Sequence, residues 1–249
     1  MAGRMRDPFH SSKYSIRRAK HHIEDFKRQK HAFFSSNPYK NFVETDLGTG
    51  DRISKVKLIK PLPEDFEGIV FDAVNNLRSA LDQAIFSLLN QEFAKFPFAD
   101  THANFKAAIK GRCKGLLPEM IALIESFKPY RGGDGFLWAL NRLCNTNKHA
   151  VITPAITVVR GVVPDIHILE GSANSIAPRW NSEKNEVEVY RIGKETRFKA
   201  NIKITMDVAI TGIPEIERSS ADAVLNQFTF TVEKIVNRLE ANAVSLGII

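Results

Sequence analysis

Apolar residues recur at steps of three and four through much of the first 150 residues. This period predicts helices at about 12–34, 64–89 and 136–148, with two shorter ones at about 103–110 and 118–127. Between the first two helices, residues 42–46 and 53–59 favour strand and flank a turn rich in glycine at 48–51. The first 150 residues are therefore predicted to be mainly helical, with a β-hairpin near 42–59.

The period changes to two after residue 151. It predicts strands at about 155–160, 165–170, 176–180, 186–192 and 197–210, and the last alternates most clearly between apolar and polar residues. Alternation of this kind is typical of an antiparallel sheet with one buried face. A C-terminal helix is expected after Ser219 and Ser220, which are suitable N-cap residues. We predict an α+β fold in a single domain, residues 1–249, in which a bundle of about five helices packs with an antiparallel sheet and a C-terminal helix.

The charge is concentrated at one end of the chain. The net charge is +7, and residues 1–40 hold ten Lys or Arg against three Asp or Glu, so the remainder is neutral. A basic helix attracts a nucleic acid or an acidic protein surface, although many such helices are only solvated faces. The candidate binding residues of the first helix are Arg17, Arg18, Lys20, Lys27 and Arg28.

Several classes of protein are disfavoured by what the sequence lacks. Its two cysteines, Cys113 and Cys144, have no metal-type or disulfide spacing, and its histidines form no helical pair suited to a metal. No motif for a cofactor is present, and no apolar run approaches the ~20 residues that span a bilayer. We expect a cytoplasmic protein with no cofactor, no metal and no membrane contact, and the sequence is compatible with a homo-oligomer.

Two polar runs are candidate sites. Asn75, Arg78 and Asp82 follow one another at steps of three and four, so they share a stripe of the longest helix. A guanidinium between an amide and a carboxylate can bind a phosphate or a carboxylate; the alternative is a structural i,i+4 ion pair.

The second run, Asn147-Lys148-His149, ends the helix at 136–148. His149 is a candidate general base and Lys148 a candidate for stabilising an anion. The alternative is that these residues only complement the negative end of the helix dipole. We expect the helix that carries Arg78 to pack beside this one, and Arg78 to lie near 147–149.

Several short runs resemble a family of uncharacterised bacterial and phage-borne proteins. The resemblance covers roughly residues 65–150 and rests on Leu77-Arg78-Ser79-Ala80-Leu81-Asp82, Phe96-Pro97-Phe98, Lys128-Pro129-Tyr130, Leu137-Trp138 and Asn147-Lys148-His149. Members commonly have His directly after the first run and Asp before Lys-His, where this chain has Gln83 and Asn147. The family carries no assigned activity.

The first run also has a looser similarity to HEPN helical ribonucleases, which use an Arg followed by four to six residues and a His. Gln83 stands where that His would be, so this helix lacks the base unless His149 supplies it. The leading hypothesis is an RNA- or nucleotide-directed protein, HEPN-like and degenerate or active. The alternatives are a non-catalytic interaction protein that uses its basic helix and, less favoured, a small-molecule enzyme.

Overall fold

The fold combines six helices with antiparallel strands, as the sequence predicted, in the residues that this computed structural model describes. Those residues are 7–146, 155–157, 163–170, 173–175, 180–181, 183–203, 207–217 and 219–249. The helices are α1 (His10–Ser35), α2 (Asp65–Leu89), α3 (His102–Arg112), α4 (Pro118–Ser126), α5 (Gly135–Thr146) and α6 (Ala221–Ser245). The strands are β1 (Tyr39–Thr45), β2 (Arg52–Leu58), β3 (Ala155–Thr157), β4 (Val163–Glu170), β5 (Ala173–Ser175), β6 (Trp180–Asn181), β7 (Glu186–Ile192), β8 (Arg197–Lys203) and β9 (Asp207–Ala209).

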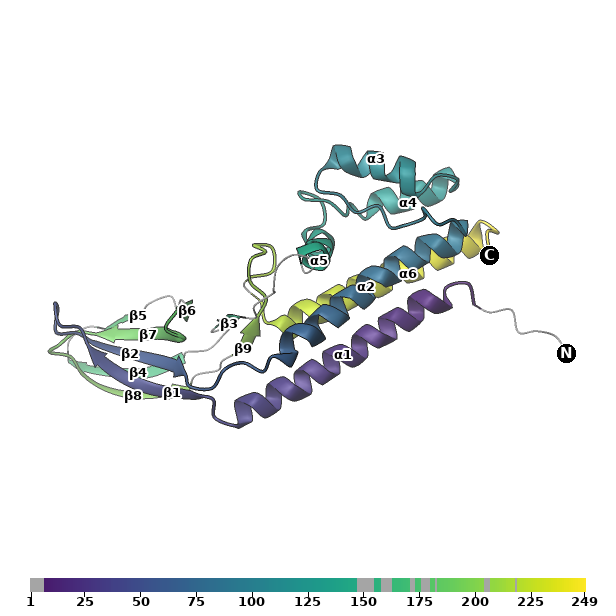
Figure 1. The fold of residues 1–249 in the computed structure, drawn as a ribbon. Helices are drawn as coiled ribbons and strands as arrows, with labels where there is room; N and C mark the ends of the chain where they lie inside the picture. The colour runs from purple at the N-terminus through teal and green to yellow at the C-terminus, as the bar shows by residue number, and fades with distance from the viewer. Residues whose placement is uncertain are drawn as a thin grey trace.

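The three long helices α1, α2 and α6 form one bundle (Figure 1). Helix α1 runs antiparallel to the other two, so its start lies beside the end of α6, opposite the strands. Each helix turns a continuous apolar stripe inward, and Ile23, Leu77 and Leu239 are buried in the shared core. Burial of these stripes is the main stabilising force for helices of this kind.

Helices α3, α4 and α5 cover the side of α2 and α6 away from α1 (Figure 1). Local chemistry sets where they begin: the Thr101 hydroxyl accepts the Asn104 N–H, Pro118 begins α4, and Asp134 accepts the Leu137 N–H. Gly133 shapes the loop before α5, because a Cβ there would collide with the Lys128 carbonyl oxygen. The glycine-rich loop is therefore a tight turn that positions α5.

The larger sheet has the strand order β1-β2-β7-β5, with β6 also paired to β7, and every pairing is antiparallel. It lies beyond the end of the helical bundle (Figure 1). Its buried residues, including Ile53, Val56, Val187 and Val189, are not part of the helical core. These buried residues of the sheet therefore lie apart from the helical core.

The predicted strand at 197–210 is two strands in the structure. Residues of β8 pair with β4, whereas β9 pairs with β3 and contacts α6, and residues 204–206 between them lie outside the described residues. The alternating pattern extends across both strands, so periodicity alone did not reveal that their partners differ. Of the predicted strand at 176–180, only Trp180 is described, and it belongs to β6.

Candidate functional site

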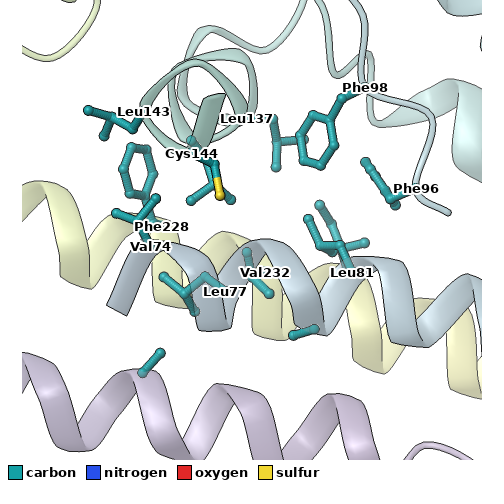
Figure 2. Close-up of a cluster of buried hydrophobic side chains, with 14 of the residues drawn as sticks. Val74, Leu77, Leu81, Phe96, Phe98, Leu137, Leu143, Cys144, Phe228 and Val232 are labelled. Carbon is teal, nitrogen blue, oxygen red and sulfur yellow. The ribbon is translucent and has the colours of Figure 1, made fainter. Parts of the chain in front are cut away.

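The polar stripe of α2 faces α5 and the extended segment 96–98. Figure 2 shows Phe96 and Phe98 over α2, with Leu137 and Cys144 of α5 beside them. The Phe96 and Phe98 ring centroids are 4.9 Å apart, and both side chains are buried. This aromatic pair covers the part of α2 that carries Arg78 and Asp82.

Arg78 contacts three partners through different parts of its planar guanidinium group. Its Nη1 lies 2.5 Å from Asp82 Oδ1, and its Nε donates to Asn141 Oδ1 of α5 over 3.2 Å. Its Cζ lies 4.3 Å from the centre of the Phe98 ring, which is close enough for a cation–π contact. The Nη1 contact is an ion pair by distance, although Nη1 makes no hydrogen bond of regular geometry with any described residue. The side chain is 16% exposed, so the guanidinium is largely enclosed.

Asp82 binds segment 96–98 through its backbone. Its Oδ1 accepts the Phe96 backbone N–H over 2.8 Å while it faces Arg78, and its side chain is 28% exposed. One carboxylate oxygen therefore forms an ion pair with a charged side chain and accepts a hydrogen bond from a backbone donor in a non-helical segment. This is the chemistry of a structural clamp, because both partners would lose their acceptor together.

Asn75 and Gln83 of α2 contact different neighbouring helices. Asn75 Oδ1 accepts from Cys144 Sγ of α5 over 2.7 Å, so it also joins α2 to α5. Gln83 Oε1 accepts from Ser15 Oγ of α1 over 2.9 Å, on the other side of α2. Five residues advance a helix by about 500°, so Arg78 and residue 83 differ by about 140° in direction. A histidine at 83 would thus face α1 rather than the Arg78 pair.

Helices α2 and α5 pack side by side, as their apolar faces suggested. Asn147, Lys148 and His149, however, lie outside the described residues, so their roles and their distance from Arg78 stay predictions. Among the described residues, no three His, Cys, Asp or Glu side chains form a group that could hold a metal ion. None of the described helices is long and apolar enough to cross a membrane.

Three lysines of the basic helix are used to hold α6. Lys13 lies 2.6 Å from Glu240, Lys20 lies 2.8 Å from Glu233, and Lys30 lies 2.7 Å from Asp222. Lys13 and Lys20 are seven residues apart, as are Glu233 and Glu240, so the pairs match two antiparallel helices in register. We refer to these three pairs as the α1–α6 ion-pair ladder.

Lys30 is the most enclosed member of this ladder. It also contacts Asp207 of β9 at 2.7 Å, so one ammonium joins α1, β9 and α6. Burial opposes the charge on Lys30, but hydrogen bonds to Asp207 and Asp222 outweigh burial and raise its pKa above the ordinary value. Burial likewise opposes the charge on Asp222, and the hydrogen bond from Lys30 leaves its pKa below the ordinary value. Both ions are therefore favoured in the folded state.

The arginines of α1 face solvent instead. Arg17 and Arg18 are exposed, and the Arg17 guanidinium lies 5.6 Å from the centre of the half-exposed Tyr14 ring. Lys27 and Arg28 form local pairs with Glu24 and Asp25, three residues back along the same helix. Of the five predicted binding residues, Arg17, Arg18 and Arg28 are exposed, Lys20 belongs to the ladder, and Lys27 is half-buried on the same side of α1 as Lys20, which lies seven residues before it.

A groove that the sequence pattern did not reveal lies between α1 and α6. It has a volume of about 390 Å³ and is lined by Lys20, Ile23, Glu24, Asn226, Thr229, Phe230 and Glu233. Its only sequence signal is Phe230, an aromatic residue that falls off the predicted core stripe of the C-terminal helix.

Comparisons with protein families, with curated proteins and with solved structures found no match to this chain.

Proposed function

We propose that this protein binds single-stranded nucleic acid through the outer face of α1, and that Arg78 and Asp82 stabilise the fold rather than perform catalysis. The observation that carries the proposal is the division of the α1 cations. Lys13, Lys20 and Lys30 are engaged with α6, whereas Arg17 and Arg18 face solvent beside Tyr14. Neither Arg17 nor Arg18 forms an ion pair with any residue that the structure describes.

Arginine and tyrosine together suit a single strand. A guanidinium binds phosphate oxygens in pairs, and an exposed aromatic ring stacks on a base of any sequence. His10 stacks against Tyr14 with ring centroids 6.4 Å apart, which extends the aromatic surface towards the start of α1. Arg17 and Tyr14 would contact neighbouring groups of one nucleotide, since they already lie against each other.

The enclosure of Arg78 and Asp82 indicates that these two residues of α2 do not catalyse a reaction. A catalytic arginine must reach a developing charge on a substrate, yet Arg78 is occupied by Asp82, Asn141 and Phe98. The predicted contributions of Lys148 and His149 remain a separate hypothesis. Such a protein would bind RNA as an RNA-directed enzyme does, but would not catalyse a reaction at Arg78 and Asp82.

The test is a binding titration with fluorescent oligouridine and, in parallel, oligodeoxythymidine at several salt concentrations. Substituting Arg17→Gln and Arg18→Gln together should weaken binding and reduce the log–log salt slope by about 0.7 for each lost phosphate contact. The matched control is Lys106→Gln with Lys110→Gln on α3, which removes the same charge from two exposed positions on the other side of the bundle.

Loss of affinity in the α1 variant alone supports the proposal, and the two oligonucleotides show whether the ribose hydroxyl contributes. Equal losses in both variants would indicate non-specific attraction to net charge and would overturn it. Absence of binding by the parent protein would also overturn it and favour an acidic protein partner.

A further inference from the structure

The groove between α1 and α6 has an exposed aromatic residue at its edge. Phe230 is 62% exposed, although its neighbours Phe228 and Val232 are buried in the core. The floor of the groove is apolar, because Ile23 of α1 is buried there. A protruding phenyl ring thus lies directly beside a hollow that is large enough to receive one.

We infer that the occupant of this groove is Phe230 of a second copy of the chain. A two-fold axis that passes between the ring and the hollow would place each ring in the hollow of the other copy. An isologous interface requires such a self-complementary surface, because each residue meets the same surface on the partner. Phe230 and the groove meet this requirement without any change in the backbone.

The charges around the groove also fit a second copy. Lys20 and Glu233 form an ion pair across its rim, and Glu24 adds an exposed carboxylate. Both signs are present in a small area, so the rim offers complementary partners to a two-fold copy of itself. A polyanion would instead meet Glu24 and Glu233, which makes nucleic acid a poor occupant.

A stable interface of standard size buries about 1,600 Å² in total, counted over both partners, so the contact would extend from the groove over the adjoining surfaces of α1 and α6. This inference does not rest on the proposed nucleic-acid function.

The first experiment measures the mass of the full chain by analytical ultracentrifugation over a range of concentrations. We expect the parent to form dimers, and Phe230→Glu to raise the dimer dissociation constant about thirtyfold or more, as the loss of a central aromatic residue does. Phe93→Glu is the matched control, because Phe93 is a 45% exposed phenylalanine after the end of α2 that does not line this groove. Far-ultraviolet circular dichroism should show unchanged helix content in both variants, and Phe230→Ala gives a milder second test.

A second experiment locates the contact directly with a short bis-maleimide crosslinker. Asn226→Cys at the groove should join two chains, whereas Gln91→Cys, exposed beyond the end of α2, should not. The native thiols give little background, since Cys113 and Cys144 are buried and burial raises the pKa of Cys113 to about 12. A monomeric parent, a Phe230→Glu dimer as tight as the parent, or equal crosslinking at both positions would overturn the inference.

Discussion

Asp82 and Arg112 both hold a segment that has no regular structure, and Arg112 Nη1 donates to the Phe98 carbonyl oxygen over 3.2 Å. Segment 96–98 pairs with no strand among the described residues, and the Phe96 N–H is satisfied by the Asp82 carboxylate over 2.8 Å. The same oxygen faces Arg78, whose guanidinium lies against Phe98. The carboxylate, the guanidinium and the aromatic segment therefore depend on one another.

Replacing Asp82 with alanine should destabilise the protein more than replacing Asp72 on the same helix. Asp82→Ala removes the acceptor of Phe96 and leaves Arg78 without its counter-charge, so we expect a loss of about 2–3 kcal/mol. Asp72 is exposed, and Asp72→Ala should change stability by less than about 0.5 kcal/mol. Urea unfolding followed by circular dichroism measures both. Equal stability of the two variants would show that the clamp contributes nothing.

Asp82→Asn separates the two roles of this residue. The amide oxygen can still accept the Phe96 N–H, but the charge opposite Arg78 is gone. We expect the free energy of unfolding of Asp82→Asn to lie between that of the parent and that of Asp82→Ala in the same unfolding experiment. A loss as large as that of Asp82→Ala would assign the whole effect to the charge.

The sequence predicted only part of this arrangement. The spacing of Asn75, Arg78 and Asp82 correctly places them on one stripe, because that follows from helix geometry. It did not reveal Asn141 or Phe98 as partners of Arg78, since tertiary packing brings them to α2. The direction of Gln83 towards Ser15 was equally hidden, because it depends on where α1 lies.

At the scale of elements, charged side chains align two helices that are far apart in sequence. The heptad spacing of Lys13 with Lys20 and of Glu233 with Glu240 matches only when α1 and α6 run antiparallel. A shift of one turn would separate both pairs at once. The ladder therefore fixes the register of α1 against α6, while the apolar stripes supply most of the stability.

Lys30→Gln should be the most costly substitution in the ladder. Its side chain is 14% exposed and joins Asp207 and Asp222, so its removal leaves two partly buried carboxylates close together, at a cost of about 2 kcal/mol. Lys20 is 48% exposed, and Lys20→Gln should cost no more than about 1 kcal/mol. Chemical unfolding at neutral pH compares the two. A Lys20→Gln variant as unstable as Lys30→Gln would contradict this ranking.

The same group predicts a dependence on pH. The lowered pKa of Asp222 adds stability above its ordinary value of 3.8, and this stability is lost as the pH falls through the folded-state pKa. The raised pKa of Lys30 adds stability below its ordinary value of 10.5, and this is lost only as the pH rises through the folded-state pKa. The difference in unfolding free energy between the parent and Lys30→Gln should therefore be constant near neutral pH. It should shrink in acid below the ordinary Asp222 pKa. A difference that grows in acid would refute the assignment.

The elements themselves were predicted to different degrees. Five helices were expected close to their observed bounds and the sixth close to its observed start; the long ones carry long apolar stripes, and Pro118 at the start of α4 is typical of a first helical turn. The hairpin of β1 and β2 also followed from its turn residues. The partners of the later strands did not follow, since a period of two shows which residues share a face but not which strand lies beside them.

At the scale of the whole molecule, the apolar core is divided. The helical core contains α1, α2, α5 and α6 together with Val208 and Ile210, whereas Ile53, Val56 and Val187 are buried in the sheet and lie outside that core. The sequence predicted a single domain, and in a single domain the two cores would unfold together. Parts of a structure that lie outside the main core can open at a lower free energy than that core.

We predict that β2 and β7 open before the helices do. Native-state hydrogen exchange should show lower protection for the amides of β2 and β7 than for those of α2 and α6. Val56→Ala removes two buried methyl groups from the sheet core and should lower the opening free energy of β2 and β7 by about 2 kcal/mol, with little change in α2. Val74→Ala is the matched control, because Val74 is equally buried in the helical core and should lower the protection of α2 and α6. If Val56→Ala lowered protection equally in the sheet and in the helices, the two cores would unfold as one cooperative unit.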